Sequence, residues 1–258
     1  MKSKLKITFL GTGTSQGIPI IGSMHPVCLS KDLKDKRLRC SVLLSWDDYN
    51  YVIDCGPDFR QQMLKNPIDR LDGILFTHEH SDHTAGIDDI RPFFFRQGTI
   101  PIYADEKVVR SLEQRFEYIF ATENRYPGAP EIDVNLIQKN ESFTLNETTI
   151  IPIEVDHNRL KIFGFRIKDF TYLTDVKRVS DAEVEKIKGS KVMVVNALRE
   201  EPHQSHFNLE EALAFIEKVQ PEVTYLTHIS HLLGFHEEVE KKLPKNVHLA
   251  YDNLIITV

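Results

Sequence analysis

Cysteine is scarce in this sequence. The 258 residues include only Cys28, Cys40 and Cys55. A small and odd number of thiols does not supply a disulfide framework, so we expect none. Cys55 follows the strand-like segment 51–54 and is expected to be a small buried hydrophobic residue.

Long apolar runs are also missing. No segment approaches the roughly 20 apolar residues that a membrane-spanning helix requires. The amino terminus, residues 1–6, is basic, but the apolar stretch after it covers only residues 7–10. That stretch is too short for the core of a signal peptide, so we expect the protein to be cytoplasmic.

The third absence is an excess of positive charge. The formal net charge is -6 at pH 7, which argues against broad binding to nucleic acids or anionic membranes, because both need a basic surface. This charge does not exclude a small phosphate ester that is held by a few local cations.

The rest of the composition is ordinary. Hydrophobic residues make up 41% and charged residues 27% of the chain, as in soluble globular proteins. The chain is long enough to bury a substantial core. Because no low-complexity linker divides it, we expect residues 1–258 to form a single domain with two related lobes.

The densest cluster of potential metal ligands follows an apolar run at residues 73–76, which is typical of a short buried strand. The ligands are His78, His80, Asp82 and His83. Charged imidazoles this close would repel one another, whereas neutral imidazole and carboxylate are ligands of divalent metal ions. The spacing of His78 and His80 places them on one face of an extended loop. The adjacent Asp82 and His83 are expected to point in different directions, so they could serve two ions.

Two later segments repeat this arrangement. Residues 172–175 and 225–228 each have an apolar run, then threonine, then a possible ligand, as do residues 75–78. A further histidine, His157, follows a strand-like segment. Because α/β folds place their sites on loops after the carboxyl ends of strands, we expect these ligands to converge. The predicted sets are His78, His80 and His157 for one ion and Asp82, His83 and His228 for the other, with Asp175 as a bridge.

In this order the ligands resemble the pattern of the metallo-β-lactamase superfamily, which is His-x-His-x-Asp-His followed by single His, Asp and His residues. The resemblance extends from residues 9–13 to residues 251–252. It implies an α/β (α+β) fold, a four-layer αββα sandwich of the metallo-β-lactamase type, with helices covering two packed sheets. It also implies two divalent metal ions, Zn or Mn.

Within the superfamily, the chain is most similar to phosphoribosyl 1,2-cyclic phosphate phosphodiesterases. The matching residues are segments 11–17, 54–60, 205–206 and 227–231 with Pro19, Gly22, Cys28, Arg39 and Ser41. This resemblance implies a dinuclear phosphodiesterase that attacks a small cyclic phosphodiester with a hydroxide bridging the metal ions. Asp82 and His206 are the expected catalytic residues. His206 stands in the Ser-His-x-x-Leu context that assists catalysis in this sub-family, whereas His203 is expected to be a surface histidine.

The same sub-family implies an additional structural zinc, held by three early cysteines and one late histidine. Cys28 and His231 match that pattern, while His25 replaces the middle cysteine and Ser23 the first. The candidate ligands are therefore His25, Cys28 and His231, completed by a water or by Cys40. A site too weak to stay filled is the alternative.

Other polar residues have less specific expectations. Asp54 stands at a strand end where the family has a carboxylate that orients a ligating imidazole, and a turn or capping role is the alternative. Phosphate-binding guanidinium groups could come from several arginines among which spacing does not choose, namely Arg60, Arg91, Arg96 and Arg199.

The hydrophobic pattern predicts the regular elements. The expected strands are 4–10, 40–46, 50–54, 73–76, 132–137, 142–145, 148–155, 160–167, 170–173, 192–196, 223–226, 247–251 and 254–258. The expected helices are 56–64, 84–95, 106–120, 180–188, 208–219 and 235–243. We expect Pro92 to break its helix, residue 132 to begin the second lobe, residues 31–39 to be a solvated loop, and Asn208 to open a capping box.

Three alternative functions remain open at this point. A tRNA 3′-processing nuclease shares the ligand set, but the acidic chain lacks a basic arm that would bind RNA. A β-lactamase or thioester hydrolase is open because a metal site does not fix the bond that is cleaved. A non-catalytic carrier resembling the pyrroloquinoline quinone synthesis protein is the third. Because the family often closes its pocket with a dimer neighbour, a homodimer is a further expectation.

Overall fold

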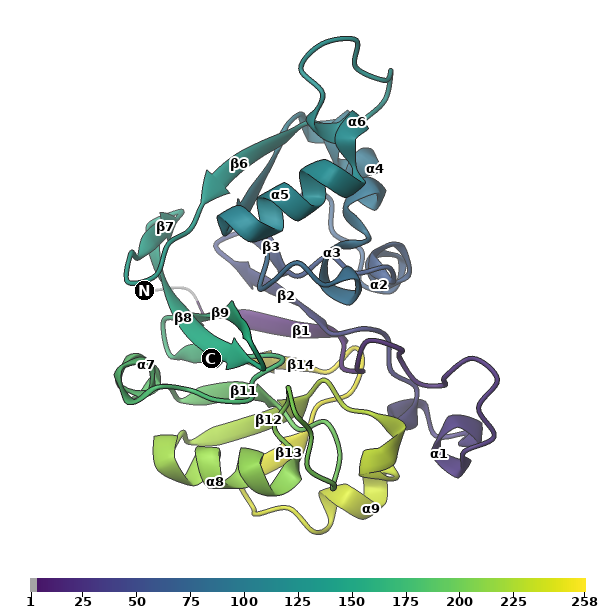
Figure 1. Cartoon of the computed structure of the whole chain (residues 1–258), viewed down its shortest axis with the longest axis vertical. Helices are drawn as coiled ribbons and strands as arrows, with labels where there is room; N and C mark the ends of the chain where they lie inside the picture. Colours follow the sequence, from purple (N-terminus) through teal and green to yellow (C-terminus); the bar gives the residue numbers. More distant parts are fainter. Residues whose placement is uncertain (1–3) are drawn as a thin grey trace.

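The computed structural model describes residues 4–258. The expectation for the basic amino terminus includes residues 1–3, which lie outside the described part. The architecture is two β-sheets with helices on their outer faces (Figure 1). The predicted αββα sandwich is confirmed. No helix in the described range is both long enough and apolar enough to cross a membrane.

The first sheet has the strand order β14-β1-β2-β3-β4-β5-β6. Its strands are β1 (Lys6–Gly11), β2 (Ser41–Trp46), β3 (Tyr49–Ile53), β4 (Gly73–Leu75), β5 (Ile100–Ala104), β6 (Ile132–Leu136) and β14 (Ile255–Thr257). The prediction that residue 132 begins the second lobe is wrong, because β6 pairs in parallel with β5 in this first sheet. A strand that follows a crossover of helices joins the sheet from which the chain departed.

The second sheet has the order β13-β12-β11-β10-β9-β8-β7. Its strands are β7 (Phe143–Leu145), β8 (Thr148–His157), β9 (Leu160–Ile167), β10 (Phe170–Tyr172), β11 (Val192–Asn196), β12 (Val223–Thr227) and β13 (Val247–Leu249). Strands β10 to β13 are parallel, so their carboxyl ends share one edge of the sheet. The final strand, β14, returns to the first sheet and pairs with β1.

The helices form the two outer layers. Figure 1 places α2 to α6 in its upper part and α7 to α9 in its lower part. The helices are α1 (Pro26–Leu29), α2 (Phe59–Lys65), α3 (Ser81–Thr84), α4 (Arg91–Gln97), α5 (Glu106–Arg115), α6 (Glu117–Phe120), α7 (Asp181–Ile187), α8 (Leu209–Val219) and α9 (His236–Glu240). Apolar clusters fill the space between the sheets and the space beneath each helical layer. This burial of apolar surface holds the layers together.

Two predicted helices differ from those observed. Residues 84–95 do not form one helix that Pro92 breaks, because α3 is followed by a 3₁₀ turn at Ile87–Ile90 and then by α4. Pro92 lies in the first turn of α4, where its missing N–H costs no hydrogen bond. The predicted helix 106–120 is interrupted at Phe116, which separates α5 from α6. The predicted capping box of α8 is present at Asn208 and Glu211.

Residues 31–39 are not simply a solvated loop. Arg37 is buried, and its guanidinium donates hydrogen bonds to Thr12 Oγ1 and to the carbonyl oxygen of Ala250. Asp252 accepts hydrogen bonds from Thr12 Oγ1 and from the backbone N–H of Leu38. The segment is therefore tied to the glycine-rich loop and to the end of the chain, which the high density of charges in the sequence concealed.

Candidate metal centre

The predicted ligands meet where strands of both sheets end. His157 is the last residue of β8, His228 directly follows β12, and the loop after β4 carries His78. Three residues of the site, each shortly after a strand, have positive φ angles: Asp54 (65°), Asp175 (57°) and His228 (53°). Non-glycine residues in the left-handed region are uncommon and often mark functional sites. The backbone therefore turns sharply at these strand ends and directs their side chains into a common space.

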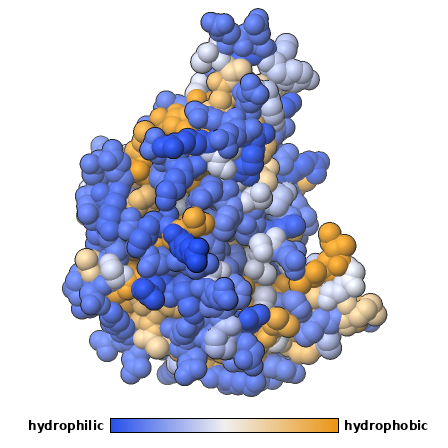
Figure 2. Space-filling model, in the orientation of Figure 1, coloured by the Kyte–Doolittle hydropathy of each residue, from blue (hydrophilic) through white to orange (hydrophobic). Residues whose placement is uncertain are grey.

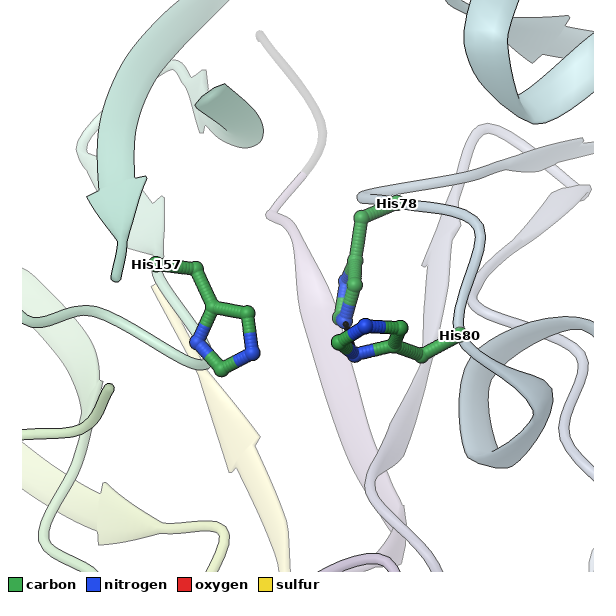
Figure 3. Close-up of side chains that lie close together, drawn as sticks. All are labelled: His78, His80 and His157. Carbon is green, nitrogen blue, oxygen red and sulfur yellow. Dashed lines mark hydrogen bonds between the residues drawn. The ribbon is translucent and has the colours of Figure 1, made fainter. Parts of the chain in front are cut away.

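The first predicted set is assembled. The ligand atoms of His78, His80 and His157 all lie within 4.8 Å of one another. His157 approaches from β8, opposite the two histidines of the loop (Figure 3). His78 Nε2 and His80 Nδ1 are 3.0 Å apart. Three imidazoles from two sheets thus form a nitrogen-rich group.

The second predicted set is also assembled. Asp82, His83 and His228 have their ligand atoms within 4.8 Å of one another. Asp82 Oδ2 lies 3.2 Å from His83 Nε2, so the expectation that these neighbours point in different directions is wrong. They belong to the short helix α3, whose backbone brings the ends of both side chains to the same group.

Asp175 lies between the two sets. Its Oδ2 is 3.3 Å from His83 Nε2, and its Oδ1 is 3.2 Å from His228 Nε2. It also groups with His78 and His83. Thr174 Oγ1 donates a hydrogen bond to Asp175 Oδ2 at 2.6 Å. The carboxylate therefore lies within reach of both sets, as a bridging ligand requires.

Asp54 occupies the position behind His83. Its Oδ2 is 2.6 Å from His83 Nδ1, and both its oxygens accept hydrogen bonds from Thr77. The carboxylate is fully buried. Because the bond to Asp54 uses Nδ1, it directs His83 Nε2 toward the cluster. Asp54 therefore orients an imidazole and does not cap α2, whose N-cap residue is Asp58.

His157 is oriented in the same manner by backbone oxygens. Its Nδ1 is 2.8 Å from the carbonyl oxygen of Asp175 and 2.9 Å from that of Ser205. A carbonyl oxygen can only accept, so Nδ1 carries the proton and Nε2 has a free lone pair. Sequence reasoning did not find this role of Ser205, because the interaction uses a main-chain atom.

The cluster has the chemistry of a site for divalent cations. Within residues 4–258, both ring nitrogens of His228 and the Nε2 of His83 are buried without a hydrogen bond of suitable geometry, although carboxylate oxygens lie 3.2–3.3 Å from the two Nε2 atoms. Orphaned buried nitrogens are costly unless another species satisfies them. Neutral imidazoles and carboxylates that share one space fit zinc or manganese. The residues present therefore fit a pair of metal ions.

Proton affinities in the cluster are strongly perturbed. Burial and the nearby His83 lower the pKa of His78 well below its ordinary value. Burial opposes ionisation of Asp175, but His228 and His83 outweigh it and hold the pKa of this carboxyl well below its usual range. A neutral imidazole and an ionised carboxylate are the forms that bind a cation.

His206 lies against the cluster. Its Nε2 is 2.9 Å from Asp175 Oδ1, and its Nδ1 is 2.9 Å from Ser205 Oγ. Burial lowers the pKa of His206 to about 4, although Asp175 opposes this shift. His203 is not a separate surface residue, because its Nδ1 lies 3.0 Å from His206 Nδ1. The sequence placed His206 before a helix, and the structure adds its contact with Asp175.

The predicted cysteine–histidine site is not assembled in the same way. The rings of His25 and His231 pack edge to face at 4.8 Å. Nevertheless, every group of three ligand atoms found within 4.8 Å of one another in residues 4–258 lies in the central cluster. Cys40 does not complete the site, since its Sγ lies 3.1 Å from Thr227 Oγ1 and 3.2 Å from the hydroxyl of Tyr172.

The predicted phosphate-binding arginines are largely engaged elsewhere. Arg91 pairs with Asp88 at 2.7 Å. Arg96 Nη2 donates to the carbonyl oxygen of Asp69, and Arg199 Nη2 to that of Pro202. Arg60 lies near Asp89, whose ionisation its charge favours. Sequence reasoning missed Arg115, whose guanidinium contacts the ligand loop.

The threonines that precede the ligands carry a role that the repeated pattern already signalled. Thr77 bonds to Asp54, Thr174 to Asp175, and Thr227 contacts Cys40 beneath the cluster. The sequence pattern of an apolar run followed by threonine and a ligand therefore encodes the ligands together with hydroxyl groups that support them.

Comparison with known proteins gives one family and several relatives. A family model described as "Beta-lactamase superfamily domain" matches residues 49–229. An octanoyltransferase of Porphyromonas gingivalis is 37% identical over 252 residues, which are 97% of this chain and 51% of that protein. The chain thus spans about half the length of this curated relative.

Two solved structures have the same fold. The crystal structure of a diphosphatase from the PhnP family has a TM-score of 0.93 and 37% sequence identity, covering 100% of this chain and 98% of that one. Zn²⁺-bound PqqB from Methylobacterium extorquens has a TM-score of 0.83 at 16% identity, covering 98% of this chain and 100% of the other. The second likeness concerns the fold alone.

Proposed function

This chain belongs to the metallo-β-lactamase superfamily of metal-dependent hydrolases, in its PhnP-like sub-family, and we propose that it hydrolyses a small phosphodiester, preferably a cyclic one. The single observation that carries the proposal is the pair of ligand groups beside Asp175, which lies near His83 and His228 and also groups with His78. His78, His80 and His157 form one group, and Asp82, His83 and His228 form the other.

The two groups would hold two divalent cations. Such a pair, when bound, lowers the pKa of a water molecule between the ions and offsets negative charge on phosphoryl oxygens. The protein contributes the positions of the ligands. Asp54 and the carbonyl oxygens at His157 fix two of the rings, so little reorganisation is needed when the metals and the substrate bind.

His206 is our candidate for the proton donor to the leaving oxygen. Its Nε2 contacts Asp175 beside the space between the ligand groups, so the ring can reach a substrate held there. Its pKa is lowered to about 4 by burial, which disfavours the protonated ring in the free protein. A bound phosphodiester brings a negative charge, and this charge raises the pKa of a neighbouring imidazole.

A small substrate suits the charge of the protein. The formal net charge of -6 disfavours a long polyanion such as a tRNA precursor, which a basic surface would attract. A non-catalytic carrier role is disfavoured because the complete ligand set is assembled and its outer partners are in place. Nothing comparable supports a β-lactamase or thioester hydrolase.

Hydrolysis of a diphosphate bond is our second candidate function. It is favoured by the PhnP-family diphosphatase, to which the chain is 37% identical over its whole length. Diphosphates and phosphodiesters both present a phosphorus atom shielded by negative oxygens, so the same cations would assist both reactions. Octanoyl transfer is not proposed, because this chain spans 51% of the relative with that name.

Metal analysis and a turnover assay test the proposal together. We expect about two Zn or Mn ions per chain and Mn²⁺-dependent hydrolysis of bis-p-nitrophenyl phosphate. His80→Ala should abolish this turnover. His248→Ala is the matched control, since that histidine pairs with Glu240 on the surface. Activity that survives His80→Ala, or that needs no metal, would contradict the proposal.

A substrate panel then separates the candidates. Ribose cyclic phosphates and nucleotide 2′,3′-cyclic phosphates represent the leading function, nucleoside diphosphate compounds the second, and tRNA precursors the nuclease. We expect the highest kcat/KM with a cyclic phosphodiester. A higher kcat/KM with a diphosphate would replace the leading candidate by the second.

A further inference from the structure

Arg115, the last residue of α5, reaches the loop that carries four of the candidate ligands. Its Nη2 donates a hydrogen bond to Thr84 Oγ1 at 2.7 Å and another to the carbonyl oxygen of Glu79 at 3.3 Å. Its Nη1 lies 3.4 Å from Ser81 Oγ. One guanidinium therefore contacts the ligand loop at three points.

Thr84 transmits this contact to a candidate ligand. Thr84 is fully buried, and its Oγ1 donates to the carbonyl oxygen of His80 at 2.8 Å. The hydroxyl thus accepts from Arg115 and donates to the backbone of His80. A chain of two hydrogen bonds leads from the helical layer to the turn that presents this imidazole.

The other end of the same loop is held without Arg115. The backbone N–H of Cys55 donates to the carbonyl oxygen of His83 at 2.7 Å. A Cβ atom on Gly56 would lie 2.0 Å from the carbonyl oxygen of Asp82, so the loop packs directly on the end of β3. The His83 end is therefore fixed by close packing, whereas the turn at Glu79 and His80 is held by the guanidinium.

We propose that Arg115 is a positioning residue that sets the affinity of the metal group formed by His78, His80 and His157. This inference rests on the proposed function. The planar guanidinium can reach Thr84 Oγ1 and the Glu79 carbonyl oxygen at the same time, and a lysine ammonium on a flexible stem does not reproduce this fork. By holding the turn, Arg115 keeps His80 beside His78 and opposite His157.

Zinc affinity of the apoprotein, measured by competition with a chromophoric chelator, tests this role. We expect Arg115→Met to weaken zinc binding about 10–100-fold, the loss typical of partners outside the ligand shell. Arg115 is an exposed residue, so the thermal midpoint of the metal-free protein should move by no more than about 2 °C. If Arg115 only stabilised the fold, its replacement would lower the thermal midpoint together with the zinc affinity.

Arg110→Met is the matched control. Arg110 lies on the same helix and its guanidinium pairs with Glu106 on the surface, so its loss removes the same charge without touching the loop. We expect unchanged zinc affinity. An equal loss in both variants would overturn the proposal, because charge alone would then explain it.

A double-mutant cycle with Thr84→Val tests the connection itself. If Arg115 acts through Thr84, the double variant should bind zinc no more weakly than the weaker single variant, within about threefold. Additive losses, or wild-type affinity in Arg115→Met, would overturn the proposal. A wild-type protein that binds no zinc or other divalent metal would instead overturn the proposed function.

Discussion

The central cluster and the segment around α1, residues 21–33 (the α1 segment), both contain histidines and other residues that metal ions prefer. The two regions differ in the hydrogen bonds that orient these side chains. In the cluster, Nδ1 of His83 is hydrogen-bonded to Asp54 and Nδ1 of His157 to the carbonyl oxygen of Asp175, so each Nε2 faces the other ligands. In the α1 segment, His25 Nδ1 accepts a hydrogen bond from the backbone N–H of Val27 and so caps its own helix. Ligand types at suitable spacing do not make a site without groups that orient them.

The surroundings of the two regions differ as well. Most of the cluster is buried, whereas His80 and Asp82 lie on its accessible side. The α1 segment exposes Ile21 (99%), Met24 (78%) and Leu33 (82%), and Figure 2 shows apolar atoms gathered on the segment that protrudes there. We therefore expect metal ions to bind in the central cluster and not in the α1 segment. The homodimer that the family resemblance implies stays a prediction.

Replacing Asp175 should reduce metal content and activity more than any other change considered. Asp175→Asn deletes a charge that lies beside His83 and His228 of one group and also groups with His78 of the other, so we expect both ions to lose a ligand. We expect a loss of kcat/KM of more than about 100-fold, which exceeds the effect of outer partners. Elemental analysis should find less than one ion per chain. Full metal content with full activity would contradict a bridging role.

Removing an outer partner should have a smaller effect. Asp54→Asn keeps the shape of the side chain but weakens its bond to His83 Nδ1, so the imidazole loses its orientation and part of its basicity. We expect zinc affinity to fall about 10–100-fold, as chelator competition would reveal. Unchanged affinity would mean that the ligands alone, without Asp54, define the site.

The ligands could be predicted from the sequence, whereas some of the groups that orient them could not. All seven ligands and their division into two sets follow from the order of strand ends and from the family pattern, because ligand chemistry is written in residue types. The sequence placed Asp82 and His83 in one set but wrongly predicted that they point in different directions, since helix α3 is too short to leave a periodic signal. The partners of His157 are carbonyl oxygens, which no residue type encodes.

In the fold, too, the local elements were predictable from the sequence, whereas contacts between distant segments were not. Strand positions followed from local hydrophobic patterns, whereas the sheet to which β6 belongs depends on pairing with β5, a contact that no local pattern contains. Arg37 was assigned to a solvated loop because arginine is usually exposed. Its burial depends on Thr12 and on the carbonyl oxygen of Ala250, which are distant in sequence.

The next prediction concerns Asp252, which accepts hydrogen bonds from Thr12 and Leu38. The stability that these contacts give should depend on pH and not on metal ions. Burial raises the pKa of Asp252 from 3.8 to about 6, against the hydrogen bonds from Leu38 and Thr12. Because the folded-state pKa exceeds the unfolded value, the stabilisation is complete below pH 3.8 and is lost as the pH rises through 6. Relative to Asp252→Asn, the wild-type free energy of unfolding should fall by about 3 kcal/mol at most across this window.

Urea unfolding of both proteins between pH 4 and pH 7, in the presence of a chelator, would measure this difference. The chelator removes bound metal, and the titration of the cluster is common to both proteins, so the difference between them reports on Asp252. A difference between the two proteins that does not change with pH would contradict the assigned cause.

The smallest effect is expected at the α1 segment itself. Cys28→Ser should leave the number of bound metal ions and kcat/KM unchanged, because Cys28 belongs to none of the ligand groups found in residues 4–258. Elemental analysis of the wild-type and Cys28→Ser proteins would check this. A variant that contains one zinc fewer would restore the predicted structural site.

Anomalous diffraction from crystals grown with zinc is the most direct test of the whole account. We predict two anomalous peaks about 3.5–4 Å apart, one beside His78, His80 and His157 and the other beside Asp82, His83 and His228, with Asp175 contacting both. Zinc found only between His25, Cys28 and His231, with Asp175 and His228 free of metal, would contradict it.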